Sequence, residues 1–109
     1  MLVKELRAQF KRKILSNGVL LPGAYNALTA MQIEQTGFEG AYISGAALSA
    51  SAGLPDIGLL TLSEFSFFIK YITQAVKIPC IADCDTGFGD VINVSRTVKE
   101  MESIGVCGI

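Results

Sequence analysis

The feature that most constrains this chain is a regular alternation of short apolar runs with stretches of helical periodicity. Four apolar runs occupy residues 19–21, 41–43, 78–82 and 106–109. Runs this short and this apolar are typical of strands buried on both faces of a parallel sheet. Between them, apolar residues recur at helical spacing, as Leu62, Phe65 and Ile69 do. The order β-α-β-α-β-α-β predicts a parallel sheet with right-handed crossovers.

Signals for helix ends agree with this order. Thr61 and Glu64 have capping-box spacing, which predicts the start of the second of these helices. Gly37 and Gly105 each follow a helical pattern, where a left-handed residue commonly ends a helix. Residues 3–15 are predicted to form a short amphipathic helix on the outside of the fold, with a solvated basic face. Further positions at helical spacing are Leu28, Met31 and Ile33 in the first helix, and Val91, Val94, Val98, Met101 and Ile104 in the third.

An open doubly wound sheet and a barrel both fit this order. Residues 22–26 read P-G-A-Y-N where a dinucleotide-binding fold would show G-x-G-x-x-G. Four strands in 109 residues is about the number of residues per strand found in an eight-stranded barrel of about 250 residues. We therefore predict an α/β fold, the N-terminal half of a (β/α)8 barrel with a short N-terminal helix. Residues 1–109 would be one partial barrel domain that stops near the end of its fourth strand, and its apolar edges would favour self-association.

Composition argues against several classes of protein. The net charge is −1, so no basic excess is available to bind a nucleic acid. No apolar run reaches the roughly 20 residues that a membrane span needs, and no signal peptide is recognisable. The chain has three cysteines and no histidine, which argues against a structural zinc site. We expect Cys80, Cys84 and Cys107 to be reduced thiols in a cytoplasmic protein, acting as small hydrophobic residues.

The strongest chemical signal is D-C-D-T-G-F-G at residues 83–89, directly after an apolar run. Alternate residues of a strand share a face, so Asp83 and Asp85 are predicted to point the same way at its carboxyl end. Barrel active sites are built at that end. Adjacent carboxylates repel, and Mg²⁺ would relieve the repulsion. The alternative is that the two acids cap the following helix.

Two further segments are candidates for a site. Residues 42–47 read Y-I-S-G-A-A, and the Ser44 hydroxyl with nearby backbone N–H groups could hold a carboxylate. A tight turn chosen for packing is the alternative. Residues 45–60 are predicted to form a long loop, with residues 46–60 acting as a lid that orders when the pocket fills. Asp56 within it is either a polar group of the site or a turn residue.

Together these segments resemble the isocitrate lyase / phosphoenolpyruvate mutase superfamily over nearly the whole chain. The motif D-x-D-T-G-F/Y-G after a strand is quite specific to that group. The pair Y-x-S-G and G-L-P-D-x-G, here at residues 42–45 and 53–58, points toward its 2-methylisocitrate lyases. In such lyases a 2-methylisocitrate-like substrate is split into pyruvate and succinate.

The resemblance implies that Asp83 and Asp85 bind Mg²⁺. It also implies that a small carboxylic acid substrate contacts Ser44, Gly45 and Ala46, with Tyr42 and Asp56 as possible pocket residues. The intact enzyme would be a homo-oligomer without a nucleic-acid or membrane partner. The metal would hold the 2-hydroxy acid end of the substrate and stabilise the enolate that forms on the pyruvate fragment.

The chain also departs from the family pattern. The catalytic cysteine loop of the family lyases, of the type K-x-C-G-H, is absent, and none of the three cysteines matches it. The catalytic residues are therefore not assigned, and the chain alone is predicted to be inactive. Ala46 stands where some members have a second glycine. Two alternatives stay open: another chemistry of the superfamily (phosphonate mutase, phosphonate hydrolase or oxaloacetate decarboxylase), and a non-catalytic binding or assembly module.

Overall fold

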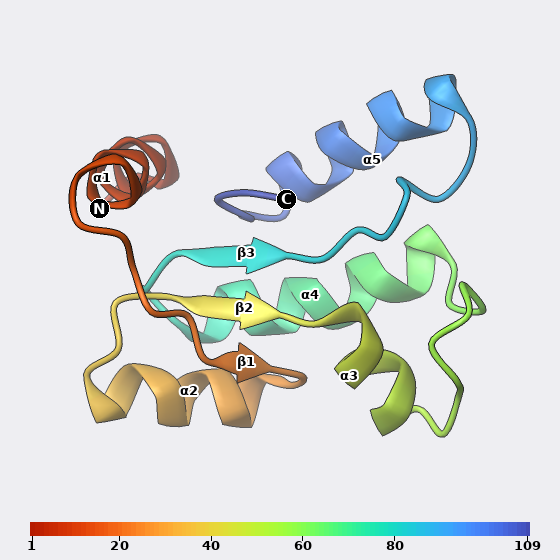
Figure 1. Ribbon diagram of the computed structural model, residues 1–109, viewed down its shortest axis with the longest axis horizontal. Coiled ribbons are helices and arrows are strands. Elements are labelled where there is room, and N and C mark those ends of the chain that lie inside the picture. Colours follow the sequence, from red (N-terminus) through yellow and green to blue (C-terminus); the bar gives the residue numbers. More distant parts are fainter.

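The computed structural model describes residues 1–109 and contains three short parallel strands and five helices (Figure 1). Helices α1 and α3 lie toward opposite ends of the strands (Figure 1). No helix combines the length and apolar composition needed to cross a membrane. The elements in chain order are α1 (Val3–Ser16), β1 (Gly23–Ala24), α2 (Ala27–Thr36), β2 (Ala41–Ile43), α3 (Gly45–Ser51), α4 (Leu62–Ala75), β3 (Cys80–Ala82) and α5 (Val91–Ser103).

The strands follow one another across the sheet in sequence order, β1-β2-β3, and all pairs are parallel. Tyr42 in the central strand is paired with Gly23 on one side and Ile81 on the other. The fourth predicted strand lies beside β3 but makes only one bridge, between Ile81 and Gly108. In a barrel each strand lies beside the strand that precedes it in the chain, all the way round. In a doubly wound sheet the strand order reverses at one point.

Two of the predicted strands have different bounds in the structure. The first was expected at residues 19–21, but β1 is Gly23–Ala24. The apolar run approaches the sheet without joining it: Leu20 is exposed, and the Leu21 side chain packs against Gly40. The third was expected at 78–82, but β3 begins at Cys80. Pro79 precedes it and has no N–H to donate, although its carbonyl accepts from Ala41 N–H at 3.0 Å.

The core lies between the sheet and helices α2, α4 and α5. Ala41 and Ile43 of β2 point into it, whereas Tyr42 between them faces the open side of the sheet. The buried helical residues of this core include Ile33, Leu48, Phe65, Ile69, Ile72 and Met101. Several positions predicted from helical spacing are instead exposed: Leu28 and Met31 on α2, and Val91, Val94 and Val98 on α5.

The predicted helix ends are confirmed. Thr61 and Glu64 form a capping box, with Glu64 N–H donating to Thr61 Oγ1 at 3.2 Å and Thr61 N–H donating to Glu64 Oε1 at 3.1 Å. Gly37 ends α2 in the left-handed region, with φ of 96°. A methyl group at Gly40 would stand 2.5 Å from Leu21 Cδ2 and 3.1 Å from Pro79 O, so glycine suits the close packing at the passage into β2.

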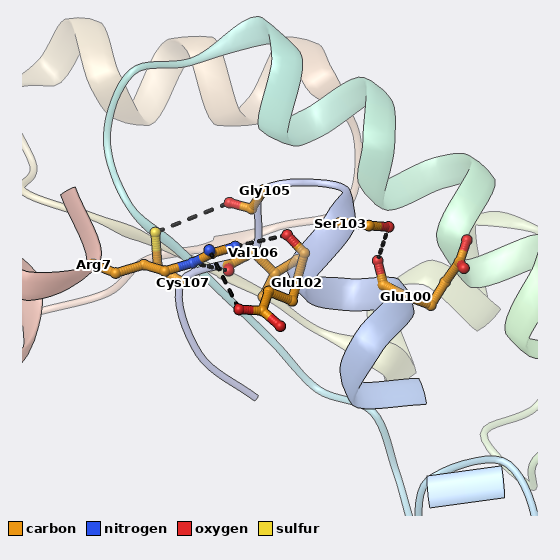
Figure 2. A network of polar contacts seen from close by, with 7 residues as sticks. All are labelled: Arg7, Glu100, Glu102, Ser103, Gly105, Val106 and Cys107. Carbon is orange, nitrogen blue, oxygen red and sulfur yellow. Dashed lines mark hydrogen bonds and ion pairs between the residues drawn. The ribbon is translucent and has the colours of Figure 1, made fainter. Parts of the chain in front are cut away.

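Helix α1 lies at the amino ends of the strands (Figure 1). Its Phe10 is buried, and its Arg7 reaches the carboxyl end of α5 (Figure 2). The Arg7 guanidinium donates to Glu102 O at 2.7 Å and to Val106 O at 3.0 Å. The basic face of α1 was expected to be solvated, and Arg7 departs from that expectation because its side chain is only 26% exposed. A cation at the end of a helix is favourable, since unpaired carbonyls gather there.

Candidate functional site

The predicted site residues lie where β2 and β3 end, at the edge of the sheet away from α1 (Figure 1). Ser44 directly follows β2, and Asp83 directly follows β3. The two strands are parallel neighbours in register, with Ile43 opposite Ala82. The residues after them are therefore brought side by side, as the sequence predicted for the carboxyl ends of parallel strands.

Asp83 is held on three sides by backbone. Its N–H donates to Ile43 O at 2.9 Å, which continues the β2–β3 pairing. Its Oδ2 accepts from Gly45 N–H at 3.3 Å, and its Oδ1 accepts from Asp85 N–H at 3.0 Å. The half-buried carboxylate is thus oriented by one amide from the β2–α3 junction and one from its own loop. A methyl group at Gly45 would stand 3.0 Å from Asp83 Oδ2, so the absence of a side chain permits this approach.

Asp85 lies near Asp83, but not for the reason that the sequence suggested. Strand β3 ends at Ala82, so the alternation of a strand does not extend to these acids. Asp85 has a left-handed backbone, with φ of 50°, and its side chain is exposed. The turn is closed by Gly87 N–H, which donates to Cys84 O at 2.8 Å. A turn, and not a pleated strand, therefore places Asp85 next to Asp83, with its N–H on the Asp83 carboxylate.

Asp83 and Asp85 both line one cavity of about 380 Å³. Tyr42 lines it from β2, and its phenol has a raised pKa because of burial first and the nearby Asp83 charge second. The opposite part of the cavity is apolar. The remaining lining residues are Ile81, Ala82, Cys84, Thr86, Gly87, Val94, Thr97, Val98 and Ile109.

No positive side chain neutralises the two acids. The three ion pairs of the chain are Arg7–Glu102, Lys13–Glu39 and Arg96–Glu100, all away from this cavity. No third acid, histidine or cysteine joins Asp83 and Asp85 in a ligand cluster. Two carboxylates facing one cavity suit Mg²⁺, which commonly takes one or two protein carboxylates and completes its shell with waters or substrate oxygens. The donor set fits that ion.

The segment after β2 is a helix and not the predicted long loop. Residues Gly45–Ser51 form α3, and the irregular part that follows is correspondingly shorter. Ser44 caps this helix, accepting from Ala47 N–H at 3.1 Å. The sequence held the signal for it: a serine at the N-cap, followed by alanines, which have the highest helix propensity. The predicted loop of residues 45–60 is therefore wrong in its first part, and the lid over residues 46–60 stays a prediction.

The other predicted contacts are only partly brought together. Gly45 is buried with its N–H on Asp83, and Ala46 is exposed beside it. Asp56 lies on an exposed turn and does not line the cavity. The end of the same loop does approach the acids, because a methyl group on Gly58 would lie 3.8 Å from Asp85 Oδ2. The role of Asp56 stays a prediction.

Sequence reasoning missed two residues that shape the site. Thr97 of α5 is 1% exposed and lines the cavity, and its hydroxyl donates to Gly87 O at 2.7 Å. A polar residue on the buried stripe of a helix, four positions before Met101, was the available signal. Phe88 packs on Phe65 with ring centroids 4.9 Å apart, which ties the same loop to α4.

The three cysteines are free, as predicted. Burial raises the pKa of Cys84 to about 11, with a smaller contribution from the Asp83 charge. Burial likewise raises the pKa of Cys80 to about 12. A thiol with such a pKa is protonated at neutral pH and is a poor nucleophile. This agrees with the prediction that the cysteines act as small hydrophobic residues.

Known proteins resemble this chain over most of its length. The profile of the family described as phosphoenolpyruvate phosphomutase matches residues 9–109. The 2-methylisocitrate lyase of Aeropyrum pernix is 52% identical over 91 residues, covering 84% of this chain and 30% of that protein. The chain thus spans about a third of the length of the relatives that it matches.

Solved structures give the same result. Phosphoenolpyruvate phosphomutase from Streptomyces platensis subsp. rosaceus superposes with a TM-score of 0.86 at 38% identity, over 93% of this chain and 36% of that one. A phosphonopyruvate hydrolase in complex with oxalate and Mg²⁺ superposes with a TM-score of 0.82 at 40% identity, over 92% and 36%. The fold is the N-terminal part of a (β/α)8 barrel, and the chain belongs to the phosphoenolpyruvate mutase/isocitrate lyase superfamily.

Proposed function

We propose that this chain forms the magnesium-binding part of a lyase that cleaves 2-methylisocitrate into pyruvate and succinate. The observation that carries the proposal is the pair Asp83 and Asp85, which share one cavity and have no cationic partner. Two kinds of relative support it: a 2-methylisocitrate lyase that is 52% identical, and a phosphonopyruvate hydrolase whose complex holds oxalate and Mg²⁺.

Asp83 and Asp85 would hold the ion. A divalent cation bound there supplies electrostatic stabilisation to negative charge that develops on the substrate oxygens. The protein's own part is orientation. Both oxygens of Asp83 already accept backbone N–H groups, from Gly45 and Asp85, so the carboxylate is fixed before any ligand arrives. A carboxylate that is already oriented needs little reorganisation when the cation binds, which favours metal affinity.

Tyr42 and Ser44 are suited to hold the carboxylate of a small acid. The Tyr42 hydroxyl is protonated at neutral pH, as an ordinary phenol is, and it can donate a hydrogen bond into the cavity. The Ser44 oxygen accepts from Ala47 N–H, which leaves the hydroxyl proton free to donate elsewhere. Gly45 and Ala46 follow Ser44 in the chain but do not line the cavity of the two acids. The residue that removes or supplies a proton in the reaction is not among these.

A phosphonate mutase is the second candidate. The family profile and a structure with a TM-score of 0.86 both carry the name phosphoenolpyruvate phosphomutase. The same acids and carboxylate contacts would serve that reaction, because its substrates also carry a carboxylate next to the reacting carbon. We further propose that the enzyme is a cytoplasmic homo-oligomer. Three unpaired thiols support a reducing compartment.

A chimera tests the proposed function. Residues 1–109 would be joined to the remaining part of the Aeropyrum pernix 2-methylisocitrate lyase, and cleavage of 2-methylisocitrate and of phosphonopyruvate would be assayed with Mg²⁺. We expect lyase activity that Asp85→Asn lowers by at least about a hundredfold, because removing an ionised ligand weakens both metal binding and charge stabilisation. Glu39→Gln, which removes an exposed carboxylate at the far end of the sheet, is the matched control and should leave the rate unchanged.

The two candidates give different results in this assay. Because the donor part supplies the family's cysteine loop, cleavage of 2-methylisocitrate would show that residues 1–109 support lyase chemistry. Activity on phosphonopyruvate alone, in spite of that loop, would replace the lyase by the mutase or hydrolase. Full activity in the Asp85→Asn chimera would remove the metal site from the proposal. A well-folded chimera without Mg²⁺-dependent turnover of either compound would favour a non-catalytic module.

A further inference from the structure

Thr97 lies on the buried side of α5, and its hydroxyl forms a hydrogen bond with a residue outside that helix. It is 1% exposed, and its Oγ1 donates to Gly87 O at 2.7 Å. A threonine in the middle of a helix commonly bonds the carbonyl one turn earlier in the same helix. Here the bond reaches the loop that carries the two acids instead.

The loop lies directly on the first turns of α5. A methyl group at Gly87 would stand 2.6 Å from Val94 Cγ2, and one at Gly89 would stand 2.6 Å from Asn93 Cγ. Both glycines also have positive φ, of 99° and 146°, which other residues rarely adopt. The loop backbone therefore touches the helix surface, and the Thr97 hydroxyl forms the one side-chain hydrogen bond that joins the two.

The position of Gly87 determines the position of Asp85. Gly87 N–H donates to Cys84 O at 2.8 Å, and this closes a turn around Asp85 and Thr86. The Gly87 carbonyl, on the next peptide unit, is the one that Thr97 holds. One end of the turn is thus fixed by β3 and the other by Thr97. The left-handed Asp85 backbone between them is an unfavourable conformation for a residue other than glycine, and it persists because its surroundings impose it.

We propose that Thr97 is a positioning residue for the divalent cation, acting through Gly87 on Asp85. The proposal rests on the metal site proposed above. Thr97 also lines the cavity with both acids, so this residue lies at the site and not merely in the core. Packing alone does not account for it, since valine has nearly the same shape. A buried hydroxyl is unfavourable unless it is hydrogen-bonded, and here its bond goes to the loop.

Terbium luminescence on the chain itself is a suitable test. Tb³⁺ binds at oxygen sites for hard cations and emits when a nearby tyrosine is excited. Tyr42 lines the same cavity as the acids, and the chain has no tryptophan. Four variants are compared with the wild type: Thr97→Val, which keeps the shape; Thr97→Ser, which keeps the hydroxyl; Asp85→Asn; and Ser66→Ala. Ser66 is the matched control, because its buried hydroxyl has no hydrogen-bond partner.

We expect Thr97→Val to raise the dissociation constant for Tb³⁺ about tenfold, which is typical of residues that orient a ligand. Thr97→Ser and Ser66→Ala should stay close to the wild type. A Thr97→Val affinity equal to that of the wild type would overturn the proposal, and so would equal losses in the valine and serine variants. If Asp85→Asn leaves the luminescence titration unchanged, the metal site itself fails, and Thr97 loses this role with it.

Amide hydrogen exchange without metal separates the two failures. The peptide that covers residues 83–89 should exchange about three- to tenfold faster in Thr97→Val than in Thr97→Ser, because one buried hydrogen bond contributes that much to loop closure. Faster exchange together with a failed Asp85→Asn titration would mean that Thr97 orders the loop although the loop binds no cation. Unchanged exchange would refute the positioning of the loop whatever the titration shows.

Discussion

Replacing Arg7 by methionine should lower the free energy of unfolding by more than the same replacement at any other charged residue of α1. The guanidinium donates to two backbone carbonyls that are far away in sequence, Glu102 O at 2.7 Å and Val106 O at 3.0 Å (Figure 2). These are carbonyls of the α5 terminus and of the turn that follows it. Methionine fills a similar volume and offers no donor.

The expected loss is about 2 to 3 kcal/mol. A hydrogen bond to a charged group contributes about 1.5–3 kcal/mol when both partners are removed from water. Two such bonds are present, but the Arg7 side chain is 26% exposed and water would partly replace them. The Glu102 carboxylate lies 3.9 Å away and is 69% exposed, so that ion pair adds about 0–1 kcal/mol at most. The sum is therefore close to one strong charged hydrogen bond.

Urea unfolding followed by circular dichroism, at one fixed protein concentration, would measure this loss. Lys13→Met is the matched control. Lys13 is on the same helix, and its ion pair with Glu39 is 2.9 Å long and joins side chains that are 52% and 57% exposed. We expect about 0.5 kcal/mol or less for the control. Arg7→Lys should lie between the two, because lysine keeps the charge and loses the forked geometry. A loss in Arg7→Met no larger than in Lys13→Met would refute the reasoning.

Two further predictions concern the thiols and the open face of the sheet. Because the pKa values of Cys80 and Cys84 are about 12 and about 11 in the fold against an ordinary 9.0, the unfolded chain gives up these protons first. The free energy of unfolding should therefore be constant below about pH 9 and fall above it; a Cys80→Ala/Cys84→Ala chain that falls as steeply would exclude the thiols as the cause. The 109-residue chain should also self-associate, since Ile109 is 58% exposed beside the apolar wall of the cavity; a single monomeric species in sedimentation velocity over a wide concentration range would contradict this.

The sequence predicted the parts of the fold that depend on local chemistry. Strand β2 has the predicted bounds, because the apolar run Ala41–Ile43 contains no proline or glycine. The capping box of Thr61 and Glu64 and the left-handed Gly37 also follow from side-chain and backbone preferences of a few neighbouring residues. Such features need no knowledge of distant contacts.

What the sequence did not predict depends on contacts across the fold. The β1 pairing falls on Gly23 and Ala24, which have little strand propensity and pair because β2 lies beside them. The apolar residues of α5 misled the prediction of its buried face, because Val94 and Val98 line the open cavity and do not enter the core. The shared strand face predicted for Asp83 and Asp85 is wrong, because β3 ends at Ala82 and Asp85 has a left-handed backbone within a turn.

The sequential order of the strands has a consequence for how the chain folds during its synthesis. Each strand pairs with the one made just before it, so no strand has to wait for a later one to be inserted between them. A growing chain emerges at about 5–20 residues per second, which is slow compared with the formation of a helix or a strand pair. Gly45 is synthesised before Asp83, so its N–H can donate to the Asp83 carboxylate as soon as β3 pairs with β2. Assembly of the acid pair would then mark a defined point in translation, after Thr97 has emerged to hold the Gly87 carbonyl.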